Sequence, residues 1–144
     1  MNPVFVDTSG FYAALDASDP NHSAALALFH EADRGEWHLL SHNYVIHETW
    51  ALVQARLGWP AVESWLRLLV PRCDVIWVDE TLHALAAARC RQAKIRRLSL
   101  TDCVSLELMF RENIREAIAY DDHLAAEGIV APSPPNIPPD LPAA

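Results

Sequence analysis

The sequence predicts an α/β fold in which helices cover both faces of a mainly parallel sheet. Short apolar segments typical of buried strands alternate with longer segments whose apolar residues recur at helical spacing. Such alternation is characteristic of βαβ units, whose strands run parallel. With 144 residues, 51% of them hydrophobic, the chain is long enough for one domain with a substantial core.

The expected elements follow in order along the chain. Strands are predicted over residues 4–7, 37–41, 73–79 and 116–121. Helices are predicted over residues 10–15, 22–35, 43–58, 60–70, 80–94, 99–113 and 122–128. Gly35, Gly58 and Gly128 end three of these helices, and Pro60 suits the first turn of another.

We expect a domain over residues 1–130 and a proline-rich tail over residues 131–144. Six of the ten prolines of the chain lie between Pro132 and Pro142. Because proline lacks a backbone N–H and favours the extended polyproline II conformation, the tail is predicted to be flexible or to lie along a surface.

Composition excludes several classes of protein. No apolar run reaches the roughly 18 residues of a membrane span, so no membrane partner is expected. The N-terminus lacks the charged and apolar regions of a signal peptide, which predicts a cytoplasmic protein. Cys73, Cys90 and Cys103 are far apart and form no Cys-x-x-Cys pair, so they are predicted to be reduced thiols rather than a disulfide framework or a zinc site.

The charge distribution is uneven. A formal net charge of −8 argues against nonspecific nucleic-acid binding over the whole surface. However, five of the eleven basic residues lie between Arg89 and Arg97, including the single lysine, Lys94. This cluster has two interpretations: a solvated helix end, which cations favour, or a strip that guides a nucleic-acid backbone.

Two aspartates end predicted strands. Asp7 follows the first strand and Asp121 follows the fourth. Ligands of open parallel sheets gather at the carboxyl ends of the strands, so two such carboxylates on neighbouring strands would share one rim. Each also has a structural interpretation, because Asp7 could bind nearby backbone amides, and Asp121 or Asp122 could cap the last helix.

Glu48 lies on the helix predicted over residues 43–58, where its neighbours at helical spacing are Tyr44, Val45, Ala51 and Leu52. A carboxylate within an apolar stripe needs a cation, a hydrogen-bond network or a water-filled pocket. We therefore favour a functional placement, with a solvent-exposed helix edge as the alternative.

Asp102 has a structural interpretation of its own. Ser99 and Asp102 have the spacing of a capping box, with Asp in place of the longer Glu. An acidic residue in a first turn also suits the helix dipole. Taken alone, Asp102 indicates only the start of a helix.

Together, these segments resemble the PIN-domain family, especially its VapC-type toxins. The resemblance rests on VFVDTSGF, HETWALV, LSLTDCVSLELM and AIAYDDHLAAEG, in that order, and extends from Val4 to about Gly128. It implies a PIN-like three-layer α/β/α sandwich whose acidic residues bind divalent metal ions and cleave single-stranded RNA. It assigns catalysis and metal binding to Asp7, Glu48, Asp102 and Asp121. We expect substrate contacts from Thr8, Ser9, Arg96 and Arg97.

The fourth acidic position departs from the family pattern. Many relatives place Thr or Ser two residues before the fourth aspartate and Phe three residues after it, where this chain has Ala119 and Leu124. The missing hydroxyl predicts a weaker water or metal contact at that corner of the site. Asp122 is the alternative to Asp121 as the fourth acid.

Physical chemistry independently favours a metal among these residues. Carboxylates that are crowded together repel one another, which raises some pKa values or requires a counter-cation. With one lysine and no Cys/His cluster, oxygen-preferring Mg²⁺ or Mn²⁺ fits best. Such ions activate water and neutralise the charge that develops on a phosphodiester. The sequence contains no His-Glu-x-x-His motif, so a zinc hydrolase is not expected. Among the histidines, His123 lies closest to the expected site.

The resemblance also implies partners, namely an RNA substrate, a protein antitoxin and a second copy of the chain. Trp50, Trp59 and Trp65 supply apolar area either for the core or for an interface. The alternative function is a catalytically inactive PIN-fold binding protein. A receiver domain would need a lysine near a late strand end, and a haloacid-dehalogenase-like phosphatase a second aspartate at the position of Ser9.

Overall fold

The computed structural model describes residues 1–133 and contains one four-stranded sheet in which every pairing is parallel. Its strands are β1 (Asn2–Val6), β2 (Trp37–His42), β3 (Asp74–Ile76) and β4 (Ala117–Ile118). Their spatial order is β3-β2-β1-β4, so the first and last strands of the sequence lie side by side at the centre and one edge. The predicted parallel sheet is confirmed, and residues that follow β1 and β4 share one rim.

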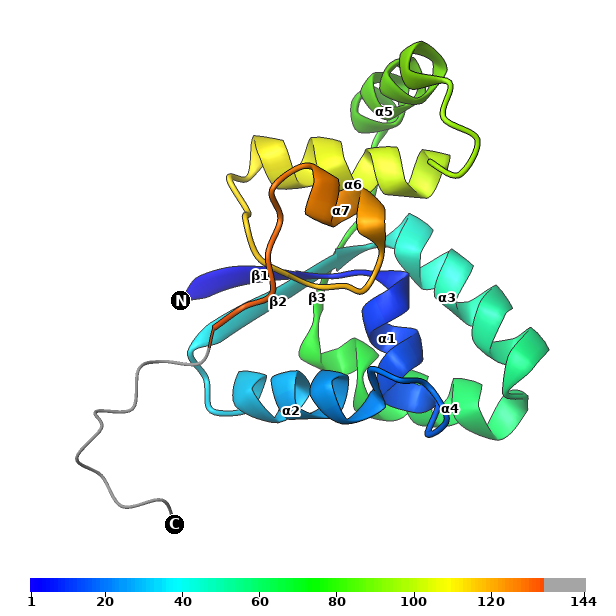
Figure 1. Cartoon of the computed structure of the whole chain (residues 1–144), viewed down its shortest axis with the longest axis vertical. Coiled ribbons are helices and arrows are strands. Elements are labelled where there is room, and N and C mark those ends of the chain that lie inside the picture. The colour runs from blue at the N-terminus through cyan, green and yellow to red at the C-terminus, as the bar shows by residue number, and fades with distance from the viewer. Residues whose placement is uncertain (134–144) are drawn as a thin grey trace.

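Within residues 1–133, seven α-helices flank the sheet. They are α1 (Thr8–Leu15), α2 (His22–Ala32), α3 (Asn43–Arg56), α4 (Trp59–Leu68), α5 (Glu80–Ala93), α6 (Leu100–Arg111) and α7 (Asp122–Ala126), with a short 3₁₀ turn over Val70–Arg72. Figure 1 shows α1, α2 and α4 below the sheet, α6 and α7 above it, and α5 stacked beyond α6. The predicted three-layer α/β/α architecture is therefore confirmed.

Two strands are shorter than the sequence predicts, because both lie at sheet edges and side chains take over their backbone groups. After β3, Trp77 is 78% exposed and the N–H of Val78 donates to the side chain of Asn43 (2.6 Å). After β4, the N–H of Tyr120 donates to Ser9 Oγ (2.9 Å) instead of to a neighbouring strand. The apolar residues at these positions predicted longer strands, but backbone pairing ends earlier in both edge strands.

The close approach of α1 to β4 depends on Gly10. A Cβ atom at this position would overlap the backbone carbonyl of Ile118. The absence of a side chain therefore lets the helix that begins after Asp7 pack directly on the strand that precedes Asp121. This contact draws the two predicted acidic positions together.

The remaining predictions have mixed outcomes. All three cysteines are free thiols, as predicted. Trp65 is fully buried, whereas Trp50 and Trp59 are 36% and 53% exposed, so the three tryptophans divide between core and surface. No helix within residues 1–133 is long and apolar enough to cross a membrane. Most of the predicted tail lies outside the described residues, although Pro132 at its start is buried.

Candidate active site

The four predicted carboxylates line one cavity of about 410 Å³ at the carboxyl ends of β1 and β4. They come from four separate segments: Asp7 after β1, Glu48 on α3, Asp102 on α6 and Asp121 after β4. Asp7 and Asp121 follow the ends of their strands by one and three residues, and Glu48 and Asp102 lie in the first half of a helix, so the fold, rather than a local motif, assembles the group.

Asp7 is the most buried of the four, with 5% of its surface exposed. Its Oδ2 accepts hydrogen bonds from the Ser9 hydroxyl (2.7 Å) and the Ser9 N–H (3.3 Å), which begins α1. Burial raises the pKa of Asp7 to about 6; the Ser9 hydrogen bonds oppose this shift, and the charges of Asp102 and Asp121 add to it. The ionised form is therefore costly until a cation compensates it.

Glu48 is held by a chain of two buried hydroxyls. Thr49 Oγ1 donates to Thr8 Oγ1 (3.1 Å), and Thr8 Oγ1 donates to Glu48 Oε2 (3.0 Å). Burial raises the pKa of Glu48 against the effect of the Thr8 bond. Since Thr8 follows Asp7 directly, this chain couples the orientation of the α3 carboxylate to the start of α1.

Asp102 and Asp121 both stabilise helix starts. Asp102 Oδ2 accepts from the N–H of Ser99 (3.0 Å), while Ser99 Oγ accepts from the N–H of Asp102 (3.0 Å), which completes the predicted capping box. Asp121 Oδ1 accepts from the N–H of His123 (2.7 Å) and caps α7.

The capping and the functional interpretations of these aspartates are therefore compatible. Within residues 1–133, Asp7, Asp102 and Asp121 each use one carboxylate oxygen for a helix start. Their second oxygens accept no hydrogen bond from a described residue. A cap fixes the carboxyl group and leaves one oxygen for a ligand.

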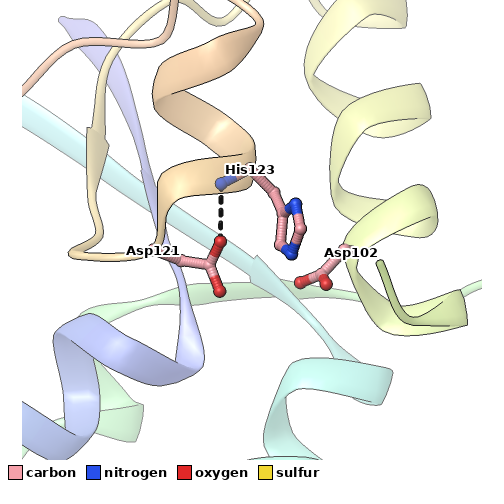
Figure 2. Close-up of side chains that lie close together, drawn as sticks. All are labelled: Asp102, Asp121 and His123. Atoms are coloured by element: carbon pink, nitrogen blue, oxygen red, sulfur yellow. Dashed lines mark hydrogen bonds between the residues drawn. The ribbon is translucent and has the colours of Figure 1, made fainter. Parts of the chain in front are cut away.

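His123 adds a nitrogen donor to the group. One ligand atom each from Asp102, Asp121 and His123 lie within 4.8 Å of one another. Figure 2 shows the imidazole of His123 between the two carboxyl groups, with its backbone N–H bonded to Asp121. Because Asp121 and His123 are separated by one residue at the start of α7, the cap that orients the carboxylate also orients this ring.

The donor set fits a hard divalent cation. None of the ion pairs formed within residues 1–133 involves the four carboxylates, so their charge is not compensated by arginine or lysine. Burial, and after it the charges of Asp102 and Asp121, raises the pKa values of Asp7 and Glu48. Carboxylate oxygens are the preferred ligands of Mg²⁺ and Mn²⁺.

The other predicted site residues occupy different positions. Arg96 and Arg97 are both exposed, but of the two only Arg97 lines the cavity. Thr8 and Ser9 line it too, but their hydroxyls are engaged by Glu48 and Asp7. Asp122, the alternative fourth acid, is exposed and outside the cavity lining.

Sequence analysis missed several residues of the cavity. They are Tyr12, Asp19, Asn21, Leu52, Arg56, Ser99 and Tyr120. A helical signal was available for two of them, because Leu52 and Arg56 follow Glu48 at intervals of four residues on α3. Nothing in the sequence indicates that the loop between α1 and α2 reaches the same cavity.

A larger cavity of about 750 Å³ lies beside the start of α3 and contains none of the four carboxylates. It is lined mainly by apolar groups, among them Tyr44, Ile46, Val75 and Trp77. Its lining has one histidine, His47, but no carboxylate, lysine or arginine, so it is not the candidate reaction site.

The fold and the acidic cavity define a nuclease-like α/β domain, and the PIN domain family model matches residues 4–127. The chain belongs to the PIN domain family. It is 32% identical over 135 residues to the 23S rRNA-specific endonuclease VapC20 of two Mycobacterium tuberculosis strains (CDC 1551 / Oshkosh and ATCC 25618 / H37Rv), a match that covers 91% of this chain and 98% of each relative.

A solved structure gives the same result. The crystal structure of M. tuberculosis VapC20, described as a sarcin-ricin loop cleaving toxin, superposes with a TM-score of 0.76 at 29% identity. The match covers 88% of this chain and 96% of that one. The resemblance inferred from four sequence segments is thus confirmed over nearly the whole domain.

Proposed function

We propose that this protein is a divalent-metal-dependent endoribonuclease that hydrolyses phosphodiester bonds in single-stranded RNA and serves as the toxin of a type II toxin–antitoxin pair. The observation that carries the proposal is the convergence of four carboxylates from four segments on one cavity, with no ion-pair partner in residues 1–133. Family membership and the similarity to VapC20 support it.

Asp7, Glu48, Asp102 and Asp121 would hold Mg²⁺ or Mn²⁺. When bound, such an ion activates a water molecule and neutralises the charge that develops on the phosphodiester. The protein itself positions these carboxylates. Asp7, Asp102 and Asp121 are fixed by helix starts, and the Thr49–Thr8 hydroxyl chain fixes Glu48.

The similarity to a 23S rRNA endonuclease suggests the substrate class. We propose that the target is an exposed loop of ribosomal RNA, where a single strand can enter an acidic cavity without a partner strand. Arg97, on the cavity edge, is the proposed contact with the RNA backbone, and Arg96 beside it adds charge at longer range. We assign Thr8 and Ser9 to positioning of Glu48 and Asp7.

The proposed partners are a protein antitoxin and a second copy of the chain, and the proposed place of action is the cytoplasm. The similarity to toxins supports the antitoxin. Exposed Trp50, Trp59 and Trp77 offer apolar area for such contacts.

The test is cleavage of purified ribosomes and of isolated ribosomal RNA by the purified protein. Each would be incubated with Mg²⁺, with Mn²⁺ or with EDTA, and the 5′ ends of the fragments would be mapped. We expect metal-dependent cleavage at discrete loop positions. Asp121→Asn should lower the rate at least a hundredfold, whereas its neighbour Asp122→Asn, outside the cavity, should stay within about threefold of the wild type.

Other outcomes would contradict the proposal. Cleavage that persists in EDTA would exclude the metal. An equal effect of Asp121→Asn and Asp122→Asn would exclude the assigned fourth acid. A folded wild type that cleaves no RNA and releases no heat on Mn²⁺ titration would favour the inactive binding protein instead.

A further inference from the structure

The acidic cavity contains two arginines that come from different elements. Arg97 precedes the capping box of α6, and Arg56 is the last residue of α3. Neither forms an ion pair with a carboxylate of residues 1–133, although five acidic side chains line the same cavity. In contrast, Arg72 and Arg89 each bind a carboxylate at 2.7 Å.

Helix α3 carries Arg56 away from the metal-binding end of the cavity. Glu48, Leu52 and Arg56 are spaced four residues apart and all line the cavity, so they form one stripe along the helix. Eight residues of α-helix rise about 12 Å, which sets the distance between the two ends of this stripe. A strand whose scissile phosphate lies at Glu48 therefore meets Arg56 with a different nucleotide.

Tyr12 holds the guanidinium of Arg56 in place. The guanidinium carbon lies 5.6 Å from the centroid of the Tyr12 ring, in the range of a cation–π contact. The ring itself is held in place, because its hydroxyl donates to Asp16 (2.8 Å), the C-cap of α1. One face of the guanidinium is thus covered by an aromatic ring, and within residues 1–133 its N–H donors form no ion pair with a carboxylate.

From this arrangement we propose that Arg56 is a second phosphate-binding residue, which Tyr12 orients to bind the RNA backbone at a nucleotide flanking the cleaved bond. A guanidinium suits this role because it donates two parallel hydrogen bonds to a phosphate. Arg97 and Arg56, which come from different elements of the same cavity lining, would then each contact the backbone of the strand. The inference rests on the proposed ribonuclease function and adds a substrate contact to it.

The test measures RNA binding and cleavage separately. A fluorescent RNA oligonucleotide that carries the mapped cleavage site would be titrated with Asp7→Asn protein, which keeps the strand intact, over a series of salt concentrations in Mg²⁺. Adding Arg56→Ala should weaken binding roughly tenfold and lower the slope of log affinity against log salt by about 0.7, the value for one phosphate contact on a single strand. Adding Tyr12→Leu should weaken binding about threefold, because the charge remains but loses its orientation.

The matched control is Arg67→Ala. Arg67 is an exposed arginine on α4 that does not line the cavity. Arg67→Ala changes the net charge by the same amount as Arg56→Ala. We expect its affinity and salt slope to stay within about twofold of the parent. In the active background, Arg56→Ala should raise the KM for RNA with little change in kcat, and leave the affinity for Mn²⁺ unchanged in calorimetry.

Two results would overturn the inference. Equal affinities and salt slopes for Arg56→Ala and Arg67→Ala would show that Arg56 contacts no phosphate, and a large loss of Mn²⁺ affinity would show that it supports the metal site instead. Arg56→Lys, which keeps charge and helix, replaces Arg56→Ala if that variant melts early; it should keep the salt slope and bind the RNA more weakly. A wild type that cleaves no RNA would overturn the proposed function itself, and this result differs from an active wild type whose Arg56 variants bind RNA normally.

Discussion

Asp7 and His42 occupy equivalent places on neighbouring parallel strands. Each directly ends or follows its strand, each caps the helix that comes next, and each is buried. Burial favours the neutral form of both side chains: it raises the pKa of Asp7 to about 6 and lowers the pKa of His42 to about 3. Their surroundings differ.

His42 is fully satisfied by the protein. Its Nδ1 accepts from the N–H of Val45 (3.3 Å), so Nε2 carries the proton and donates to Ser105 Oγ (2.8 Å), and the ring stacks on Phe5. Asp7 instead faces other carboxylates across a cavity. The same position between a strand and a helix thus supports stability after β2 and the candidate reaction site after β1, depending on whether the polar group finds its partners within the protein.

The largest expected effect on stability comes from His42→Ala. The variant leaves a cavity beside Phe5, removes the cap of α3 and leaves the N–H of Val45 unpaired, which should cost about 3–4 kcal/mol of unfolding free energy. His38→Ala on the same strand is the control, since His38 is half-exposed and its Asp74 partner lies 3.3 Å away. It should cost below about 1 kcal/mol. Denaturant melts would check both, and equal losses would contradict the assignment.

Asp7→Asn should raise the free energy of unfolding, whereas His42→Ala lowers it. Because the pKa of Asp7 is raised in the folded state, its stabilising contribution is complete below pH 3.8 and is lost as pH rises through 6. Ionised Asp7 therefore costs up to about 3 kcal/mol at pH 8 without metal, and the amide removes that cost. We expect higher stability in EDTA together with lost cleavage. A destabilised variant would mean that Asp7 is structural.

The pH dependence of stability sharpens the comparison. Neutral His42 contributes stability above pH 6.5 that is lost as pH falls toward 3, whereas protonation of Asp7 adds stability as pH falls from 6 to 3.8. In the metal-free wild type the two slopes, each about 1.4 kcal/mol per pH unit, largely cancel between pH 6 and 4. Asp7→Asn should lose stability in acid, and His42→Gln should gain it. Parallel profiles for both variants would contradict this account.

The smallest expected effect is that of Thr49→Val, which removes the first hydroxyl of the chain that orients Glu48. A lost hydrogen bond of about 1 kcal/mol predicts roughly a fivefold weaker affinity for Mn²⁺. Thr49→Ser keeps the hydroxyl and should bind Mn²⁺ like the wild type. Calorimetric titration with Mn²⁺ would measure both variants, and a Thr49→Val protein with unchanged affinity would leave the hydroxyl chain without a function.

Much of the fold followed from local patterns. The helices appear where apolar periodicity placed them, and the Ser99–Asp102 capping box forms as its spacing predicts. Predictions failed at the sheet edges, where β3 and β4 are shorter than their apolar segments. His42 is fully buried, which its sequence neighbours do not indicate. Burial of this kind depends on partners distant in sequence, such as Ser105.

The sequence by itself determined the candidate site residues: four acidic positions in a family order, and the helix starts that orient three of them. Local hydrogen bonds and apolar periodicity involve residues that are close in sequence, so they can be predicted from the sequence. Only the tertiary structure decided which groups share a cavity. The pairing of β1 with β4, the approach allowed by Gly10 and the stripe of α3 that ends at Arg56 join segments as far apart as residues 7 and 121, and such contacts arise from packing of the whole domain.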